Sequence, residues 1–219
     1  WRNSPLPEAL QKDIQVEVQA SYRTLNVLTE KTKRVWIVFH GYGQLTEYFI
    51  RKFNVLNAEE NFIIAPQGMS KFYLEGFSGR VGATWMTKED RDTEIDNQQQ
   101  YINAVLTQEL QDIEGKEIIL FGFSLGVATM GRFAAYNHFR FDKLVLWAGT
   151  FPHELEKTDI RHWTHPYSIS YYTGNEDPFL KEGMIERQHN RLRELTGKDI
   201  SVHSFHGKHE VISELLLQI

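Results

Sequence analysis

One serine stands in a setting that suits covalent chemistry. Ser124 lies in Gly122-Phe123-Ser124-Leu125-Gly126, a G-x-S-x-G pattern. The short apolar run 117–121 before it favours a buried strand, and residues 127–136 after it suit a buried helix. A serine at such a strand-to-helix turn projects its hydroxyl above the sheet, so the pattern predicts a nucleophile. The alternative is a serine in an ordinary turn between a strand and a helix.

A serine hydroxyl is a weak nucleophile at neutral pH and needs a base, which in turn needs an orienting carboxylate. Asp177 follows the expected strand 168–173, and His209 lies between the expected strand 200–205 and a C-terminal helix. We therefore predict a triad of Ser124 as nucleophile, Asp177 as acid and His209 as base.

Neighbouring residues offer alternatives for two of these roles. His206 is the alternative base, whereas His203 falls inside the expected last strand. Asp177 is preferred to Glu176 because a glycine and a proline frame it in the turn 174–178.

A second glycine-rich loop follows the first strong strand of the chain. His40-Gly41-Tyr42-Gly43 comes directly after the apolar run 34–39, and its glycines allow backbone N–H groups to line a cavity. We expect the N–H groups of Tyr42 and Leu125 to form an oxyanion hole. His40 is predicted to be a structural imidazole that holds this loop.

Strand and helix patterns alternate along the chain, which predicts one α/β domain over residues 1–219. The sheet is expected to be doubly wound and mostly parallel, with an N-terminal antiparallel hairpin formed by 14–18 and 22–28. The parallel strands are expected at 35–39, 62–65, 117–121, 143–148, 168–173 and 200–205. Sites in such sheets lie beyond the carboxyl ends of the strands, where the predicted triad residues fall.

The segment 66–90 has no clear periodicity and is predicted to be a lid or a substrate-pocket loop. Aromatic and apolar side chains on this segment can line an apolar pocket. One further aromatic side chain, that of Phe151, follows the expected strand 143–148 and can line the same pocket. The predicted substrate-binding residues are Phe72, Tyr73, Trp85, Met86 and Phe151. The alternative is that they fill ordinary core.

Composition excludes several classes of protein. The net charge of -5 gives no basis for nucleic-acid binding. The absence of cysteine excludes thiol chemistry and cysteine metal sites, and no apolar run is long enough to insert stably in a membrane. We predict no metal and no cofactor.

The chain begins at Trp1, so we expect a trimmed N-terminus and a cytoplasmic location, with a removed signal peptide as the alternative.

These motifs together resemble the α/β-hydrolase superfamily, and within it the phospholipase/carboxylesterase group that includes acyl-protein thioesterases. The resemblance runs from residue 35 to the C-terminus. It rests on five motifs: His40-Gly41-Tyr42-Gly43, Ala83-Thr84-Trp85, Gly122-Phe123-Ser124-Leu125-Gly126, Gly174-Asn175-Glu176-Asp177-Pro178 and Gly207-Lys208-His209. It implies the same triad and the same oxyanion donors, and it places Trp85 near the substrate entrance. Leu125 departs from the glutamine that is common in the group.

The function predicted from these residues is hydrolysis of carboxylic esters or thioesters with short-to-medium acyl chains, through an acyl-enzyme. A peptidase or amidase on the same triad is one alternative, and a ligand-binding protein without turnover is another. The expected partner is a small-molecule ester, and the N-terminal arm 1–12 and the edge hairpin could mediate homodimerisation.

Overall fold

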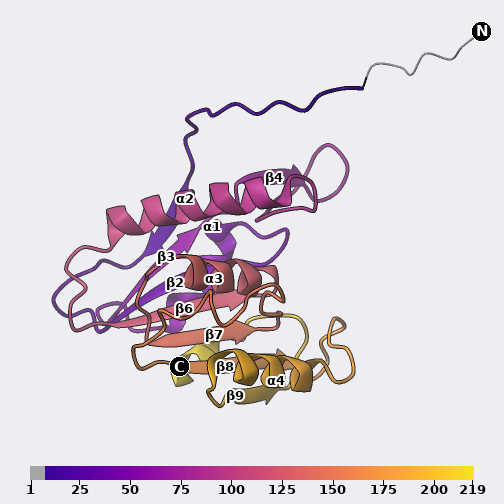
Figure 1. Cartoon of the computed structure of the whole chain (residues 1–219). Coiled ribbons are helices and arrows are strands. Elements are labelled where there is room, and N and C mark those ends of the chain that lie inside the picture. The colour runs from indigo at the N-terminus through magenta and orange to yellow at the C-terminus, as the bar shows by residue number, and fades with distance from the viewer. Residues whose placement is uncertain (1–7) are drawn as a thin grey trace, which may run out of the picture.

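The computed structural model describes residues 8–219, which fold around a seven-stranded sheet (Figure 1). The strand order is β1-β3-β2-β6-β7-β8-β9, and every pairing is parallel except that of β1 with β3. The strands are β1 (Tyr22–Leu25), β2 (Arg34–Phe39), β3 (Asn61–Pro66), β6 (Glu117–Phe123), β7 (Lys143–Trp147), β8 (Ser168–Gly174) and β9 (Ser201–Phe205). The predicted doubly wound, mostly parallel α/β sheet is confirmed.

Helices cover both faces of the sheet, which explains why its central strands are apolar on both sides. One core lies under the three long helices, with Ile102, Phe133 and Leu192 among its buried residues. The other core includes Phe53 and Leu216 from the short helical turns. The helices are α1 (Thr46–Phe49), α2 (Arg91–Glu109), α3 (Leu125–Tyr136) and α4 (Met184–Thr196), and the 3₁₀ turns are η1 (Ile50–Val55) and η2 (Ser213–Gln218).

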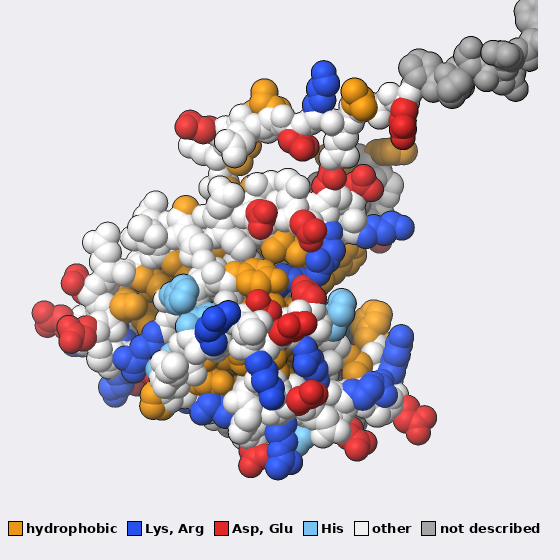
Figure 2. All heavy atoms as spheres, viewed as in Figure 1, with side chains coloured by type: hydrophobic (Ala, Val, Ile, Leu, Met, Phe, Trp, Pro, Cys, Tyr) orange, Lys and Arg blue, Asp and Glu red, His pale blue; other side chains and the backbone are white. Residues whose placement is uncertain are grey.

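The predicted N-terminal hairpin is wrong in one of its strands. Residues 14–18 form no strand, and the antiparallel partner of β1 is β3. The apolar side chains of Leu10, Ile14, Val16 and Val18 are exposed along the arm (Figure 2). Alternation predicts a strand with two unlike faces, but it does not specify the edge that the strand joins. Residues 1–7 of the predicted arm lie outside the described part of the chain.

Two further elements differ from the sequence-based expectation. The segment 66–90 contains an antiparallel hairpin, β4 (Ser70–Tyr73) with β5 (Val81–Thr84), rather than a loop alone. The expected C-terminal helix is only the 3₁₀ turn η2. No helix within residues 8–219 is long and apolar enough to cross a membrane.

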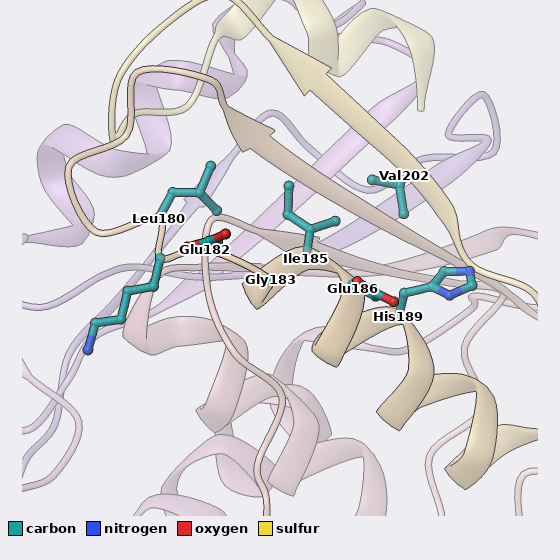
Figure 3. Close-up of a pocket in the computed structure, with 8 residues that line it drawn as sticks. Leu180, Glu182, Gly183, Ile185, Glu186, His189 and Val202 are labelled. Atoms are coloured by element: carbon teal, nitrogen blue, oxygen red, sulfur yellow. The ribbon is translucent and has the colours of Figure 1, made fainter.

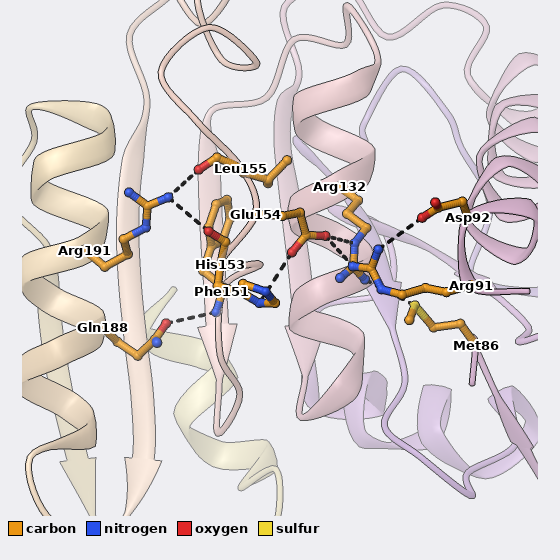
Figure 4. Close-up of polar contacts among 10 residues, drawn as sticks. All are labelled: Met86, Arg91, Asp92, Arg132, Phe151, His153, Glu154, Leu155, Gln188 and Arg191. Carbon is orange, nitrogen blue, oxygen red and sulfur yellow. Dashed lines mark hydrogen bonds and ion pairs between the residues drawn. The ribbon is translucent and has the colours of Figure 1, made fainter. Parts of the chain in front are cut away.

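A partly buried ion cluster joins the segment after β7 to two helices (Figure 4). Glu154 Oε1 accepts hydrogen bonds from Arg132 Nε on α3 at 2.7 Å and from Arg91 Nη2 on α2 at 2.8 Å. Partial burial would raise the pKa of Glu154, but the bonds from Arg132 and Arg91 outweigh it and lower the pKa to about 2. The ionised carboxylate therefore stabilises the fold, since the Arg132 side chain is almost fully buried.

We expect Glu154→Gln to reduce the free energy of unfolding by about 2 kcal/mol at pH 7, because the buried guanidinium loses its charged acceptor. This carboxylate contributes fully above the ordinary glutamate pKa of 4.5, and its contribution falls as the pH drops towards the folded value of about 2. Urea unfolding at pH 7 and pH 3 checks this: the gap between wild type and variant should narrow at pH 3. Glu156→Gln, at an exposed position, is the matched control. An equal effect of both substitutions would contradict the prediction.

Candidate active site

The predicted nucleophile occupies a strained turn between β6 and α3. Ser124 has φ 54° and ψ -120°, a conformation that L-residues rarely adopt. Its N–H donates to Trp147 O at 2.8 Å, and its carbonyl accepts from Val127 N–H at 3.0 Å. These bonds hold the turn in place, so the surrounding structure maintains the strain.

Close packing explains the glycines on either side of this turn. A Cβ on Gly126 would lie 2.6 Å from His40 O and would also overlap Phe39 O. A Cβ on Gly122 would lie 2.7 Å from Gly126 O. The glycines therefore allow α3 to approach the ends of β2 and β6.

We expect the free energy of unfolding of Ser124→Gly to exceed that of Ser124→Ala by about 1 kcal/mol, so that Ser124→Gly unfolds at a higher urea concentration. Glycine reaches a positive φ without steric cost, and relief of strain exceeds its extra loss of backbone entropy. Equilibrium unfolding of both variants measures the difference. Equal stability of the two variants would show that the turn stores no appreciable strain.

The structure brings the three predicted triad residues together. His209 Nε2 lies 2.8 Å from Ser124 Oγ, and His209 Nδ1 lies 2.7 Å from Asp177 Oδ2. A carboxylate can only accept, so Nδ1 carries a proton and Nε2 is free to accept from the serine hydroxyl. The side chains are 19% exposed for His209 and 4% for Asp177, so the carboxylate is shielded while the imidazole remains reachable.

Aromatic and backbone contacts hold the acid and the base. The His209 ring lies between Phe123 and Phe179, with ring centroids 5.0 Å and 4.7 Å away. Asp177 Oδ1 accepts from Phe179 N–H at 2.8 Å, which fixes the second carboxylate oxygen. A side chain at Gly174 would overlap the backbone carbonyls of Gly207 and Lys208, so the acid and base loops pack backbone against backbone.

The alternative acid and base lie outside this arrangement. His206 is 82% exposed, and its Nδ1 is 3.8 Å from Glu176 Oε1. His203 lies on β9, where its ring stacks on Tyr172 at 4.5 Å. Neither histidine therefore makes the contact to Ser124 that His209 makes.

The backbone N–H groups of Tyr42 and Leu125 have no hydrogen-bond partner among residues 8–219. Gly41 N–H donates to Gln44 Oε1 at 2.7 Å and Gly43 N–H donates to Ala83 O at 2.8 Å, so the loop on both sides of Tyr42 is fixed. Leu125 is the first residue of α3, whose N–H groups point outward from the helix start. The two free donors are the pair that the sequence predicted for an oxyanion hole.

His40 supports this loop from below. It is fully buried, and its Nδ1 donates to Gly41 O at 2.7 Å while its Nε2 accepts from Gly68 N–H at 2.9 Å. Burial lowers the pKa of His40 to about 4, against a smaller opposing effect of the bond to Gly41. With both nitrogens engaged, the imidazole is structural, as predicted.

Two of the predicted substrate-binding residues are buried instead. Trp85 is 2% exposed, stacks on the His40 ring at 4.7 Å and donates from Nε1 to His40 O at 2.8 Å. It thus packs against the loop 40–43, the predicted oxyanion loop, rather than at the substrate entrance. Phe151 is buried against Gly131 of α3, within the main core. Both positions correct the sequence-based expectation.

The other three predicted substrate residues lie nearer the surface. Phe72 packs on Tyr42, with ring centroids 5.3 Å apart, and Tyr73 is half exposed. Met86 Sδ contacts Arg132 Nη1 at 3.5 Å, on the ion cluster of Figure 4. Phe72 therefore adjoins the predicted oxyanion loop, whereas Met86 belongs to the cluster around Glu154.

A family model described as Phospholipase/Carboxylesterase matches residues 24–219, which include every residue of the site described above. This chain belongs to the phospholipase/carboxylesterase family. It is accordingly a hydrolase of the serine esterase type. No curated protein sequence matches it significantly.

Solved structures share the fold of this carboxylesterase-family chain at low sequence identity. Acyl-protein thioesterase 2 from Zea mays is 15% identical, with TM-score 0.67, over 91% of this chain and 96% of that one. Esterase PE8 is 17% identical, with TM-score 0.66, over 92% and 100%. A phospholipase/carboxylesterase from Dyadobacter fermentans is 18% identical, with TM-score 0.62, over 90% and 92%.

A cleft of about 660 Å³ opens beside the imidazole of this family member, and the sequence analysis missed most of its residues. Phe123, His209 and Val211 are among the residues that line it. Glu210 follows His209 in the chain. The remaining lining residues come from the segment 43–52 and from the β4–β5 hairpin: Gly43, Gln44, Leu45, Tyr48, Phe49, Lys52, Leu74, Gly79, Arg80 and Val81. None of the five predicted substrate residues lines it. The predicted pocket segment does contribute, but through the turn of its hairpin, where sequence periodicity gives no signal.

A second hollow, of about 510 Å³, lies between α4 and the edge strand β9 (Figure 3). Leu180, Ile185 and Val202 contribute its apolar side chains, and none of the triad residues lines it. Within residues 8–219 no three His, Asp or Glu side chains are grouped so as to hold a metal ion. Of these two hollows, the cleft lined by His209 is the one that adjoins the predicted triad.

Proposed function

We propose that this hydrolase cleaves carboxylic esters and thioesters with short-to-medium acyl chains by a Ser124–His209–Asp177 triad. The observation that carries the proposal is the continuous hydrogen-bonded chain from Ser124 Oγ through His209 to Asp177, at 2.8 Å and 2.7 Å. This arrangement gives the serine a base and gives the base an orienting carboxylate, which is the requirement for nucleophilic catalysis.

In the proposed reaction, Ser124 Oγ attacks the ester carbonyl while its proton moves to His209 Nε2. The oxyanion of the tetrahedral intermediate accepts from Tyr42 N–H and Leu125 N–H, and each donor contributes roughly 3–4 kcal/mol in the transition state. The imidazolium then protonates the leaving oxygen or sulfur, and the C–O or C–S bond breaks to leave the acyl-enzyme. Water, deprotonated by His209, releases the acid and restores the serine.

The acyl length is proposed from the side chains around the oxyanion loop. Tyr42 and Phe72 pack together beside the N–H that would bind the carbonyl oxygen, and Tyr42 is 65% exposed. An open aromatic surface of this kind offers apolar contact to a few methylene groups without enclosing a long chain. The proposed partner is correspondingly a small-molecule ester.

A fluorophosphonate probe tests the proposal directly, because it phosphonylates only an activated serine. We expect stoichiometric labelling at Ser124, located by peptide mass spectrometry, together with turnover of p-nitrophenyl butyrate. A protein that binds esters without labelling or turnover would be a ligand-binding relative instead. Faster cleavage of the matching p-nitroanilide would favour an amidase.

A further inference from the structure

The cleft beside His209 combines apolar walls with two cationic side chains. Leu45, Phe49 and Leu74 are among its apolar residues, while Lys52 on η1 and Arg80 before β5 also line it. A site of this composition suits a ligand that carries an apolar body and an anionic end.

The two cations are available to a ligand. Neither Lys52 nor Arg80 has an ion-pair partner among residues 8–219. The acidic residue nearest to Lys52 in the sequence, Glu47, is paired with Arg51 at 3.5 Å and with Arg23 at 3.6 Å.

One acidic residue lines the same cleft, and its charge does not cancel the two cations. Glu210 accepts from Lys208 N–H through Oε1 at 3.4 Å. The lining therefore carries two positive charges and one negative charge, and its net charge is positive although the whole chain is acidic. An anionic group is the complement of such a lining.

The position of the cleft indicates which part of the ester enters it. His209 lines the cleft, and in the proposed mechanism its imidazolium donates a proton to the leaving oxygen. The leaving group therefore lies on the His209 side of the carbonyl, next to Phe123 and Val211. The acyl group lies on the other side, towards Tyr42 and Phe72.

We propose that the cleft binds the alcohol portion of the substrate and selects alcohols that carry a carboxylate or phosphate group, through Lys52 and Arg80. The inference rests on the proposed function and specifies its substrate class. Arg80 can grip either oxyanion with two parallel hydrogen bonds, while Lys52 acts as a point charge. Both side chains are exposed, so each contributes a modest selectivity that salt weakens.

Matched acetate esters test the proposal. The pair 4-acetoxyphenylacetate and 4-acetoxyphenylacetamide differs in charge at the alcohol end. A third ester, 4-acetoxybenzylphosphonate, carries a phosphonate in place of the carboxylate and tests recognition of a phosphate-like group. We expect wild type to prefer an anionic ester over the amide by about tenfold in kcat/KM at low salt. The preference should fall about threefold in Lys52→Gln or Arg80→Gln and be lost in the double variant. Lys181→Gln, in the hollow of Figure 3, is the matched control and should keep the wild-type ratio.

Several outcomes would overturn the inference. One is a wild-type kcat/KM for both anionic esters that is close to that for the neutral amide. Another is a preference for the anionic ester that persists in the double variant. A third is a loss of this preference in Lys181→Gln as large as that in Lys52→Gln or Arg80→Gln. A preference that appears only when the carboxylate is on the acyl side, in phenyl hydrogen glutarate against phenyl glutaramate, would also contradict it.

Binding of the product alcohol separates this inference from the proposed function, because it needs no turnover. We expect 4-hydroxyphenylacetate to bind Ser124→Ala more tightly than 4-hydroxyphenylacetamide does, by about tenfold, and the double cation variant to lose the difference. If wild type hydrolyses no ester but this selectivity holds, the proposed function fails and the cation site stands. If esters are hydrolysed and binding shows no charge preference, only the cation site fails.

Discussion

Alanine in place of Ser124 should reduce ester hydrolysis by about five to six orders of magnitude, to the residual level that binding and the oxyanion hole provide. The hydroxyl is the only group in the proposed mechanism that forms the acyl-enzyme, and alanine keeps the turn but removes the oxygen. The measurement is kcat/KM on p-nitrophenyl butyrate, with labelling by the fluorophosphonate probe as a second readout. The unfolding midpoint should stay close to that of wild type.

A surface serine provides the control. Ser78 is exposed on the β4–β5 connection, and Ser78→Ala should retain wild-type turnover and labelling. Retention of more than a few per cent of turnover by Ser124→Ala, in protein free of wild type, would rule out Ser124 as the nucleophile.

Glutamine in place of His209 should have an effect of similar size, about five orders of magnitude in kcat/KM, because the serine then lacks a group that can take its proton. Glutamine preserves the volume and one hydrogen bond to Asp177, so the fold should be kept. The serine should also lose its reactivity towards the fluorophosphonate probe.

His206→Gln is the matched control for the base, only three positions away. Its imidazole is largely exposed and lies near Glu176, so its replacement should change kcat/KM by less than twofold. A larger loss in His206→Gln than in His209→Gln would reassign the base and overturn the proposed triad.

The sequence predicted the parts of the site that depend on local pattern. Ser124 follows an apolar run, Asp177 and His209 follow strands of alternating pattern, and the carboxyl ends of parallel strands meet at one edge of a sheet. The observed strand order places the ends of β6, β8 and β9 on one side of the sheet, so these residues can approach one another. The free N–H groups of Tyr42 and Leu125 follow from the same argument, because each comes directly after such a strand end or at a helix start.

The parts that were wrong or missed depend on contacts between distant segments. Trp85 sits among glycines in an irregular stretch, which resembles a pocket wall in the sequence. Only the fold reveals that its indole N–H donates to His40 O under the oxyanion loop. Phe151 likewise follows a strand end, but the small residue Gly131 on α3 leaves room for it in the core.

The N-terminal arm and the cleft illustrate two further limits. Residues 14–18 alternate as a strand does, yet a strand also needs a free edge in the right register, which a single segment does not encode. The cleft is lined by residues such as Lys52, Leu74 and Val211 from three separate parts of the chain. No spacing rule links these segments, so their convergence could not be predicted from periodicity.

In the proposed mechanism, the β4–β5 hairpin contributes to substrate binding but supplies none of the triad residues. The residues of the proposed triad follow β6, β8 and β9, whereas part of the cleft lining comes from the connection between β4 and β5, with Gly79 and Arg80. This hairpin forms its own two-stranded sheet and meets the central scaffold through the bridge between Gln44 and Ala83. We therefore expect changes confined to its turn to alter substrate range more than they alter the positions of the reacting atoms.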